Sequence, residues 1–486
     1  MVSILNSPYA TYVDSLTPED RRDIAHIKRF LECWMGDKVF RDDVELGERS
    51  LGDLAAERGA YLDDIDTIRP LFDPDYTQFR LDATRETWRL TAIWDEYHKM
   101  MLSTLGFYTW AGSSKGYFSE FDEWRDAQIL RTYVDVGIGA TYLTHPPIAF
   151  EISDGCSVGC WFCGISAKKF GGHYEYDERG AANWRATLEA ARSVLGDAMM
   201  SGFCYWATEP LDHPQYDSFI EDYYDINGVI PQTTSAIPLK NIELTRRVLS
   251  IWEKSKHVPN RFSILTTSIM RRVHKEFSAE ELFGVELVHQ NIGSMSTKSI
   301  AGKAYQEGNS TGEKVKKRKD NLEDGTIACV TGFLVNMPKK TLRLVSPTLP
   351  NEDWPDGYYV FSSKRFTDPE DMAVKMREMI LEQAGRKVSG DKPIQTGSRH
   401  WFEVTEEGGY RIRDSKTGYS SEAFNTIAPM MQEGNSSPKE ILKQAIIDGH
   451  DPIAVMKIMS DLDSMGIIGD RLCPPKGVTA AMMELF

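Results

Sequence analysis

The chain has 486 residues, of which 41% are hydrophobic and 26% are charged, enough for a sizeable buried core and about three domains. It carries 56 Lys and Arg against 72 Asp and Glu, a net charge of -16. This balance argues against broad binding to nucleic acid or to an anionic membrane, since both need a basic surface. No stretch approaches the roughly 20 apolar residues of a membrane span, and the first residues lack the pattern of a secretory signal, so we expect a cytoplasmic protein.

Residues 1–145 are predicted to form a mostly helical N-terminal region. One helix is expected to begin at Pro18, because proline suits the first helical position and two acidic residues follow it in the first turn. A second helix is predicted over residues 84–102, where apolar side chains recur at helical spacing.

Residues 146–390 change to short apolar runs that alternate with amphipathic segments, the pattern of a parallel sheet with helical crossovers. The predicted strands are residues 148–152, 202–207, 228–232, 261–266, 284–289 and 326–335. The predicted helices are residues 184–195, 216–224, 240–253, 270–283 and 369–383. Six such strands predict an α/β fold with a partial (β/α)6 barrel rather than a closed eight-stranded one.

A polar stretch between residues 292 and 325 contains a basic run at residues 314–319. Such a run is typical of a solvated loop. It is also compatible with a lid that engages an acidic peptide when a barrel mouth closes. The sequence leaves both interpretations open.

Residues 398–470 are predicted to form a separate small domain, followed by a tail at residues 471–486. Two strands, 400–404 and 410–413, are expected to pair around a turn with two glycines. The remaining elements expected are helices at residues 421–431, 438–448 and 452–465, and a strand at residues 466–469. This order is typical of a winged-helix-like unit.

Three of the seven cysteines lie close together directly after the first predicted strand, at Cys156, Cys160 and Cys163. Seven cysteines in a chain of this length are too few for a disulfide scaffold, so the cluster indicates a metal or catalysis. A loop with this spacing can wrap one corner of a [4Fe–4S] cube, bind three irons and leave the fourth open to a small molecule. Flanking glycines permit the tight turns that this wrapping requires.

Structural zinc is the alternative for these cysteines. Zinc normally takes four protein ligands at a closed site, and no fourth Cys or His follows at regular spacing. The spacing therefore favours an iron–sulfur cluster with an open iron.

The segment Cys-x3-Cys-x-aromatic-Cys, on a loop after the first barrel strand, resembles the signature of radical S-adenosylmethionine (SAM) enzymes. The resemblance implies that Cys156, Cys160 and Cys163 hold the cluster and that SAM binds the open iron. It places Phe162 near the adenine of SAM. It also implies that SAM is cleaved to methionine and a 5′-deoxyadenosyl radical, which abstracts a hydrogen atom.

Further SAM contacts are expected at the carboxyl ends of later strands, where barrel enzymes place their sites. Thr208, Glu209 and Pro210 are similar to the end of the family's Gly-Gly-Glu-Pro motif, which implies that Glu209 receives the SAM amino group. Thr208 departs from the usual glycine, so close backbone approach is less assured. A surface carboxylate in a turn is the alternative for Glu209. Four hydroxyl residues at strand ends are candidates for the ribose or carboxylate of SAM: Thr234, Ser235, Thr267 and Ser268.

Cys329 lies in the last predicted barrel strand, where alternate residues face the lumen. A thiol there can return a hydrogen atom to a carbon radical, because an S–H bond is weaker than most C–H bonds. The alternative is a small buried hydrophobe. Cys204 is a second candidate donor, and no further Cys-x2-Cys pair indicates an auxiliary cluster.

The helical N-terminus, the block from Val330 to Lys340 and the winged-helix-like tail together resemble the radical SAM epimerases that mature ribosomally made, proteusin-type peptides. The resemblance implies conversion of L- to D-residues in a precursor peptide, with Cys329 as hydrogen donor and an electron donor such as flavodoxin or ferredoxin. It implies that the C-terminal domain recognises the leader of that peptide, for which a winged hairpin offers an edge strand.

Other functions remain open at this point. Another radical SAM reaction without auxiliary clusters, such as backbone excision or carbon–carbon bonding, fits the same cysteines. A peptide-binding scaffold with a structural cluster is a different class of protein. The C-terminal domain can also be purely structural, whereas DNA binding is disfavoured because the segment at residues 438–448 mixes lysines with acidic residues.

Overall fold

The computed structural model describes residues 7–306, 322–383, 392–396, 402–406, 408–412, 421–465 and 467–469. These residues form a mixed α/β protein, and the strands among them close no barrel. None of the described helices combines the length and the hydrophobicity that a membrane crossing requires. The basic run at residues 314–319 and the tail at residues 471–486 lie outside the described residues.

The N-terminal region is helical, as predicted. Its α-helices are α1 (Pro8–Ser15), α2 (Pro18–Gly36), α3 (Lys38–Leu46), α4 (Leu51–Ala56), α5 (Arg89–Ala111) and α6 (Ser119–Val136). Short 3-10 turns complete it at η2 (Ile65–Leu71), η3 (Thr77–Phe79) and η4 (Gly137–Tyr142). The predicted start at Pro18 is confirmed, because the Thr17 side chain accepts a hydrogen bond from the Asp20 amide.

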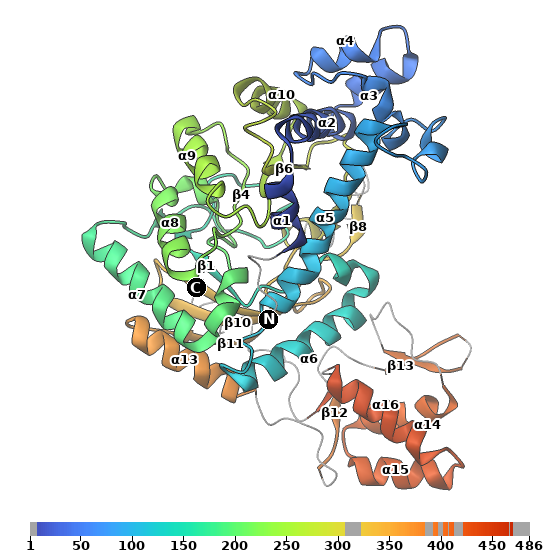
Figure 1. Cartoon of the computed structure of the whole chain (residues 1–486). Coiled ribbons are helices and arrows are strands. Elements are labelled where there is room, and N and C mark those ends of the chain that lie inside the picture. Colours follow the sequence, from blue (N-terminus) through green and yellow to red (C-terminus); the bar gives the residue numbers. More distant parts are fainter. Residues whose placement is uncertain are drawn as a thin grey trace.

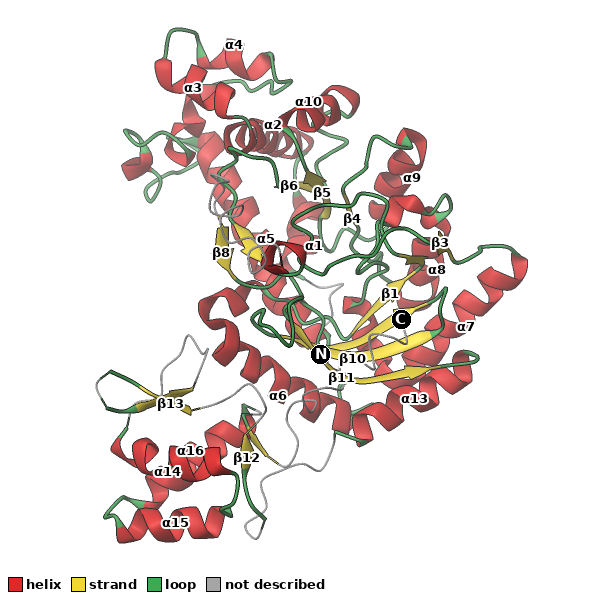
Figure 2. Cartoon of the chain, turned by 180° about the vertical axis from the view of Figure 1, so that it is seen from behind, coloured by secondary structure: helices red, strands yellow, loops and turns green. Residues whose placement is uncertain are grey.

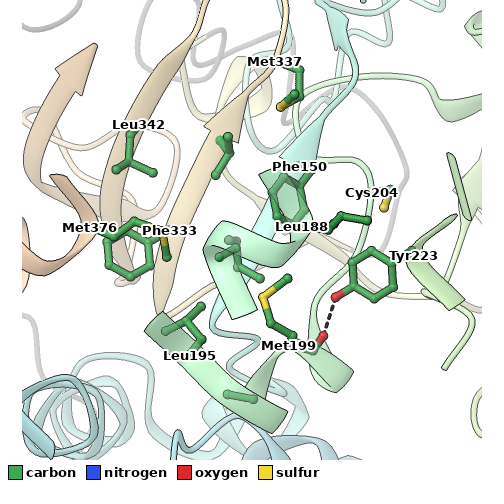
Figure 3. Close-up of a cluster of buried hydrophobic side chains, with 14 of the residues drawn as sticks. Phe150, Leu188, Leu195, Met199, Cys204, Tyr223, Phe333, Met337, Leu342 and Met376 are labelled. Atoms are coloured by element: carbon green, nitrogen blue, oxygen red, sulfur yellow. Dashed lines mark hydrogen bonds between the residues drawn. The ribbon is translucent and has the colours of Figure 1, made fainter. Parts of the chain in front are cut away.

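One sheet contains four strands in the order β1 (Ile148–Glu151), β9 (Gly332–Asn336), β10 (Thr341–Pro347) and β11 (Tyr358–Arg365). β1 and β9 are parallel, and the other pairs are antiparallel. Figure 2 shows this sheet with α7 (Glu178–Leu195) and α13 (Pro369–Leu381) along it. Its outer face shares one core with α6, α7 and α13, part of which is drawn in Figure 3.

The other main sheet is parallel and has the order β4 (Thr234–Ser235), β5 (Asn260–Ile264) and β6 (Val285–His289). Its crossovers are α9 (Ile242–Trp252) and α10 (Thr267–Glu276), and α8 (Tyr216–Asn227) precedes it after the turns η5 (Gly196–Ser201) and η6 (Pro210–Asp212). In Figure 1 this sheet lies beside the N-terminal helices. Side chains on one face of β5 and β6 share a core with α2 and α5: Phe262, Ile264, Val285 and Leu287.

Three of the predicted strands were wrong, because their residues form a strand only in part or not at all. Residues 202–207 form a single parallel bridge between Ala149 and Phe203, after which the chain bends away. Residues 228–232 form no strand, and β4 begins at Thr234. The run at residues 326–335 becomes a strand at Gly332, where the φ of +152° and the missing side chain let β9 approach Pro147.

The structure also differs from the prediction in the order of strands. The last predicted barrel strand pairs with β1 instead of continuing from β6, and β10 and β11, which the sequence analysis missed, extend it. The remaining small sheets are the pairs β2 (Ser153–Asp154) with β3 (Gly172–His173) and β7 (Lys298–Ile300) with β8 (Leu322–Asp324).

The C-terminal unit has a core of its own, joined by Val134 of α6. It contains the hairpin of β13 (Phe402–Val404) and β14 (Tyr410–Ile412), and β12 (Gln395–Thr396) paired with β15 (Ile468–Gly469). Its helices are α14 (Glu422–Glu433), α15 (Pro438–Ile447) and α16 (Pro452–Ser464), drawn in red in Figure 1. The predicted hairpin and three helices are therefore confirmed within the described residues.

Candidate functional site

The three clustered cysteines lie on one loop between β2 and β3. The loop is closed at its base, where the Cys156 amide donates to the Lys168 carbonyl (2.9 Å) and the Phe170 amide donates to the Cys156 carbonyl (3.2 Å). Gly155 has a φ of +79°, and a Cβ there would lie 2.5 Å from the Lys169 carbonyl oxygen. A glycine is therefore required for this closure.

The cysteine thiols share a half-buried space. Burial raises the pKa of Cys156, and burial together with the neighbouring Cys163 and Cys156 raises the pKa of Cys160 to about 11. Backbone N–H groups point at two of the sulfurs, from Val158 to Cys156 (3.4 Å) and from Ala167 to Cys163 (3.3 Å). Such N–H groups stabilise thiolate character, which a metal also requires of its cysteine ligands.

Three thiols on one loop are a donor set that an iron–sulfur cluster can take. No three Cys, His, Asp or Glu side chains of the described residues surround one point as the ligands of one metal ion do. In an iron–sulfur cube each thiolate binds a different iron, so the three sulfurs need not converge on one point. The donor set and its spacing on one glycine-rich loop fit such a group.

Asp212 fastens the cysteine loop to the turn η6. Its carboxylate accepts from the Ser157 amide (2.9 Å), the Ser157 hydroxyl (2.6 Å) and the Lys240 ammonium (2.8 Å). The Asp212 side chain is only 2% exposed, whereas Lys240 is 54% exposed, so the carboxylate is held at the edge of the protein surface. Asp212 was not among the residues predicted from the sequence.

Glu209 stands at the start of η6 and is buried. Its two carboxylate oxygens accept from the amides of Leu211 (3.1 Å) and Ala236 (2.8 Å), and the Ser235 hydroxyl also bonds it. Burial nevertheless raises the pKa of Glu209 to about 7. The structure thus brings Glu209 and Ser235 together, and it leaves the buried Thr208 hydroxyl without a partner among the described residues.

The other predicted SAM contacts are more scattered. Thr234 faces away from Glu209 and bonds the Tyr205 hydroxyl (2.8 Å). Thr267 begins α10 and accepts from the Asn291 side chain (3.4 Å), and Ser268 is exposed. The Phe162 ring packs edge-on against Trp161. Phe162 lies on the cysteine loop itself, whereas no contact described for Thr234, Thr267 or Ser268 joins them to that loop.

Cys329 lies in the loop before β9, so its predicted place within a strand was wrong. It is half-buried and packs on a small apolar cluster that includes Phe203, Ala328 and Val330. Burial raises the pKa of the Cys329 thiol to about 12, against a smaller lowering by the Arg261 guanidinium. The thiol is therefore protonated at neutral pH.

The loops of the cysteine triplet and of Cys329 touch each other. A Cβ on Gly164 would lie 2.7 Å from Cγ1 of Ile327, two residues before Cys329. Ile165 packs on the same apolar cluster as Cys329. Cys329 accordingly belongs to a loop that contacts the cysteine loop.

Cys204, the alternative donor, has a different environment. Its side chain is wholly buried in the main core near Phe150, Leu188 and Tyr223 (Figure 3). It is a packed core thiol without access to an interior site.

Arg261 and Glu286 are site residues that the sequence analysis missed. They are cross-strand partners on β5 and β6, and the Arg261 Nε donates to Glu286 (2.9 Å). Their side chains are 42% and 30% exposed, whereas the next residue on β5, Phe262, is buried. Their pairing follows from the register of β5 and β6, which the sequence alone does not give.

Comparisons with known proteins identify a relative, and the name of that relative states no activity. No family model and no solved structure matches the chain. The uncharacterized protein y4wI of Sinorhizobium fredii (strain NBRC 101917 / NGR234) is 37% identical over 469 residues, which cover 94% of this chain and 89% of that protein. The chain therefore belongs to the same protein family as y4wI.

Proposed function

We propose that this protein is a radical SAM peptide epimerase that converts L- to D-residues in a ribosomally made precursor peptide. The observation that carries the proposal is the contact between two loops distant in sequence. One holds three cysteines and no fourth described ligand, and the other holds the half-buried thiol of Cys329. A radical generator and a hydrogen-atom donor need this proximity.

The proposed architecture is a partial (β/α)6 barrel with a winged-helix-like unit after it. The parallel pair of β1 and β9, and the separate parallel sheet of β4, β5 and β6 with its crossovers α9 and α10, support the first part. The hairpin β13–β14 and the three helices of the C-terminal unit support the second. An edge of that hairpin is the proposed place for the leader of the precursor, by addition of a strand.

Cys156, Cys160 and Cys163 would hold the [4Fe–4S] cluster, and Glu209 would receive the amino group of SAM. When bound, the cluster and SAM supply a 5′-deoxyadenosyl radical that removes an α-hydrogen from the peptide. Glu209 suits an ammonium partner because its buried carboxylate, with a pKa of about 7, has no cation within the described contacts. Ser235 and the Ala236 amide hold that carboxylate in place.

Cys329 would return a hydrogen atom to the opposite face of the α-carbon. Its raised pKa keeps the S–H bond intact at neutral pH. Donation breaks that S–H bond, forms the C–H bond of the D-residue and leaves a thiyl radical. One electron from a donor such as flavodoxin or ferredoxin, and one proton from solvent, then restore the thiol.

The test is co-expression of the protein with peptides encoded beside its gene, in deuterated water and without oxygen. The proposal expects D-residues that each carry one deuterium at the α-carbon. Cys329→Ala should still form 5′-deoxyadenosine but yield no D-residue. D-residues from Cys329→Ala, or no 5′-deoxyadenosine from the intact protein, would reject the proposal.

A further inference from the structure

A row of polar side chains crosses the inner face of the parallel sheet. Thr234, Arg261 and Glu286 are register partners on β4, β5 and β6, so they lie side by side on one face. Alternate residues of β5 and β6 on this face are half-exposed, whereas those on the opposite face are buried. Parallel sheets usually have both faces covered by apolar packing. A polar row that stays accessible on one face of this sheet is therefore a candidate binding surface.

Tyr205 completes the row from the neighbouring segment. Its hydroxyl donates to the side-chain amide oxygen of Gln232 and bonds the Thr234 hydroxyl (2.8 Å). Burial raises the pKa of Tyr205 to about 12, so the hydroxyl is neutral. Tyr205 and Cys329 pack on the same apolar cluster, and the Arg261 guanidinium is close enough to lower the pKa of the Cys329 thiol slightly, so the row lies near that thiol.

The row offers both a hydrogen-bond donor and an acceptor that are unused. The Arg261 Nε is bonded to one Glu286 oxygen, but the Nη groups of Arg261 and the other Glu286 oxygen bond no described residue. The pair carries no net charge, and its neighbours Tyr205, Gln232 and Thr234 are neutral. A carboxylate would gain little attraction there, whereas an amide can accept from Arg261 and donate to Glu286.

We propose that Arg261 and Glu286 bind an uncharged amide group of the substrate, a peptide unit of its backbone, and so position the neighbouring residue at Cys329. The inference rests on the proposed function for the identity of the substrate as a peptide. Arg261 and Glu286 are positioning residues in this scheme, because the hydrogen transfer itself belongs to Cys329.

The test measures alkylation of Cys329 in the anaerobically reconstituted protein, without SAM or reductant. Iodoacetamide and iodoacetate deliver the same carbon to the thiol, one with an amide and the other with a carboxylate. Mass spectrometry of the Cys329 peptide gives the labelling rate for each reagent. The rate for iodoacetate is divided by the rate for iodoacetamide, and this ratio is compared between variants. The intrinsic reactivity of the two reagents cancels in that comparison.

In Glu286→Gln the guanidinium loses its counter-charge, so labelling by iodoacetate should rise at least about tenfold relative to iodoacetamide. In Arg261→Gln the Glu286 carboxylate loses its counter-charge, so labelling by iodoacetate should fall relative to labelling by iodoacetamide. Arg246→Gln is the matched control, because Arg246 pairs with Glu281 and Glu276 at the surface. That control should leave the ratio unchanged.

Competition identifies the source of the amide. N-acetylglycine N-methylamide, which contains two peptide units, should slow labelling in the intact protein but not in Arg261→Gln. Equal protection by propionamide would move the assignment to a side-chain carboxamide and overturn the backbone version. An unchanged ratio in both Arg261→Gln and Glu286→Gln, with the melting temperature retained, would overturn the site. Because no radical step is used, either result is independent of the epimerase assay.

Discussion

Gly164 lies directly against Ile327, so close that a single added carbon on the glycine would stand 2.7 Å from Cγ1 of the isoleucine. Gly164 follows the last cysteine of the triplet, and Ile327 precedes Cys329 by two residues. The contact is therefore the point where the two loops of the candidate site set each other's position. Gly164 has no side chain, and the branched side chain of Ile327 occupies the space that this leaves.

Gly164→Ala should destabilise the protein by about 1–3 kcal/mol, because the new methyl group overpacks against Ile327. Ile327→Ala alone should cost less, since Ile327 is 51% exposed. The double variant should recover at least about 1 kcal/mol relative to the sum of the single effects, because the shortened residue 327 makes room. Urea unfolding of the four proteins measures this coupling, and strictly additive effects would show that the two loops do not meet.

Much of this organisation was predictable from the sequence, because it depends on local signals. The start of α2 follows from Thr17 and Pro18, and the closure of the cysteine loop follows from its glycines. What the sequence did not predict depends on partners distant in the chain. The run before Asn336 is apolar along its length, but it becomes a strand only where Gly332 admits the backbone of Pro147. Cys329 therefore lies in the loop before β9 and not in the predicted strand.

The site residues divide in the same way. The three cysteines are recognisable because their spacing on one loop is itself the signal. Arg261 and Glu286 are far apart in the sequence, and only the register of β5 and β6 makes them partners. The role of Asp212 could not be predicted from the sequence either, because it comes from a contact with Ser157 on a different loop.

Asp212→Ala should loosen the cysteine loop and lower its capacity for iron. The substitution leaves the Ser157 amide and the Lys240 ammonium without their carboxylate, and because water can solvate both exposed groups the expected cost is about 1–2 kcal/mol. Iron per chain after anaerobic reconstitution should fall, and the remaining iron should be lost faster in air. Asp217→Ala is the control, because Asp217 pairs with Arg247 nearer the surface and should cost under about 1 kcal/mol. Equal iron contents in the two variants would contradict the role of Asp212.

Cys204→Ala should behave as a core variant and not as a loss of the hydrogen donor. Removal of the buried sulfur leaves a small cavity near Phe150 and Tyr223 (Figure 3), with an expected cost of about 1 kcal/mol. The fraction of D-residues formed should remain near that of the intact protein at a temperature where both are folded. A loss of D-residues with unchanged 5′-deoxyadenosine formation would transfer the donor role to Cys204.

His289 should make the protein less stable in acid. It is buried on β6, and neither ring nitrogen has a partner among the described residues. Burial lowers its pKa from 6.5 to about 4, so the unfolded chain takes up a proton on His289 that the folded one does not. The stability that depends on the neutral ring is present above pH 6.5 and is lost as the pH falls towards 4.

His289→Leu removes this proton uptake together with two unsatisfied nitrogens. Relative to the intact protein it should gain about 2 kcal/mol more at pH 5 than at pH 7.5, the difference expected for one histidine with this shift. Gly36 packs on the imidazole, because a Cβ there would lie 2.5 Å from Nδ1, so the leucine must repack and can lower stability at both pH values. The pH-dependent difference between the two proteins in urea unfolding is the deciding quantity. A difference near zero would show that His289 is already protonated, or solvated, in the folded protein.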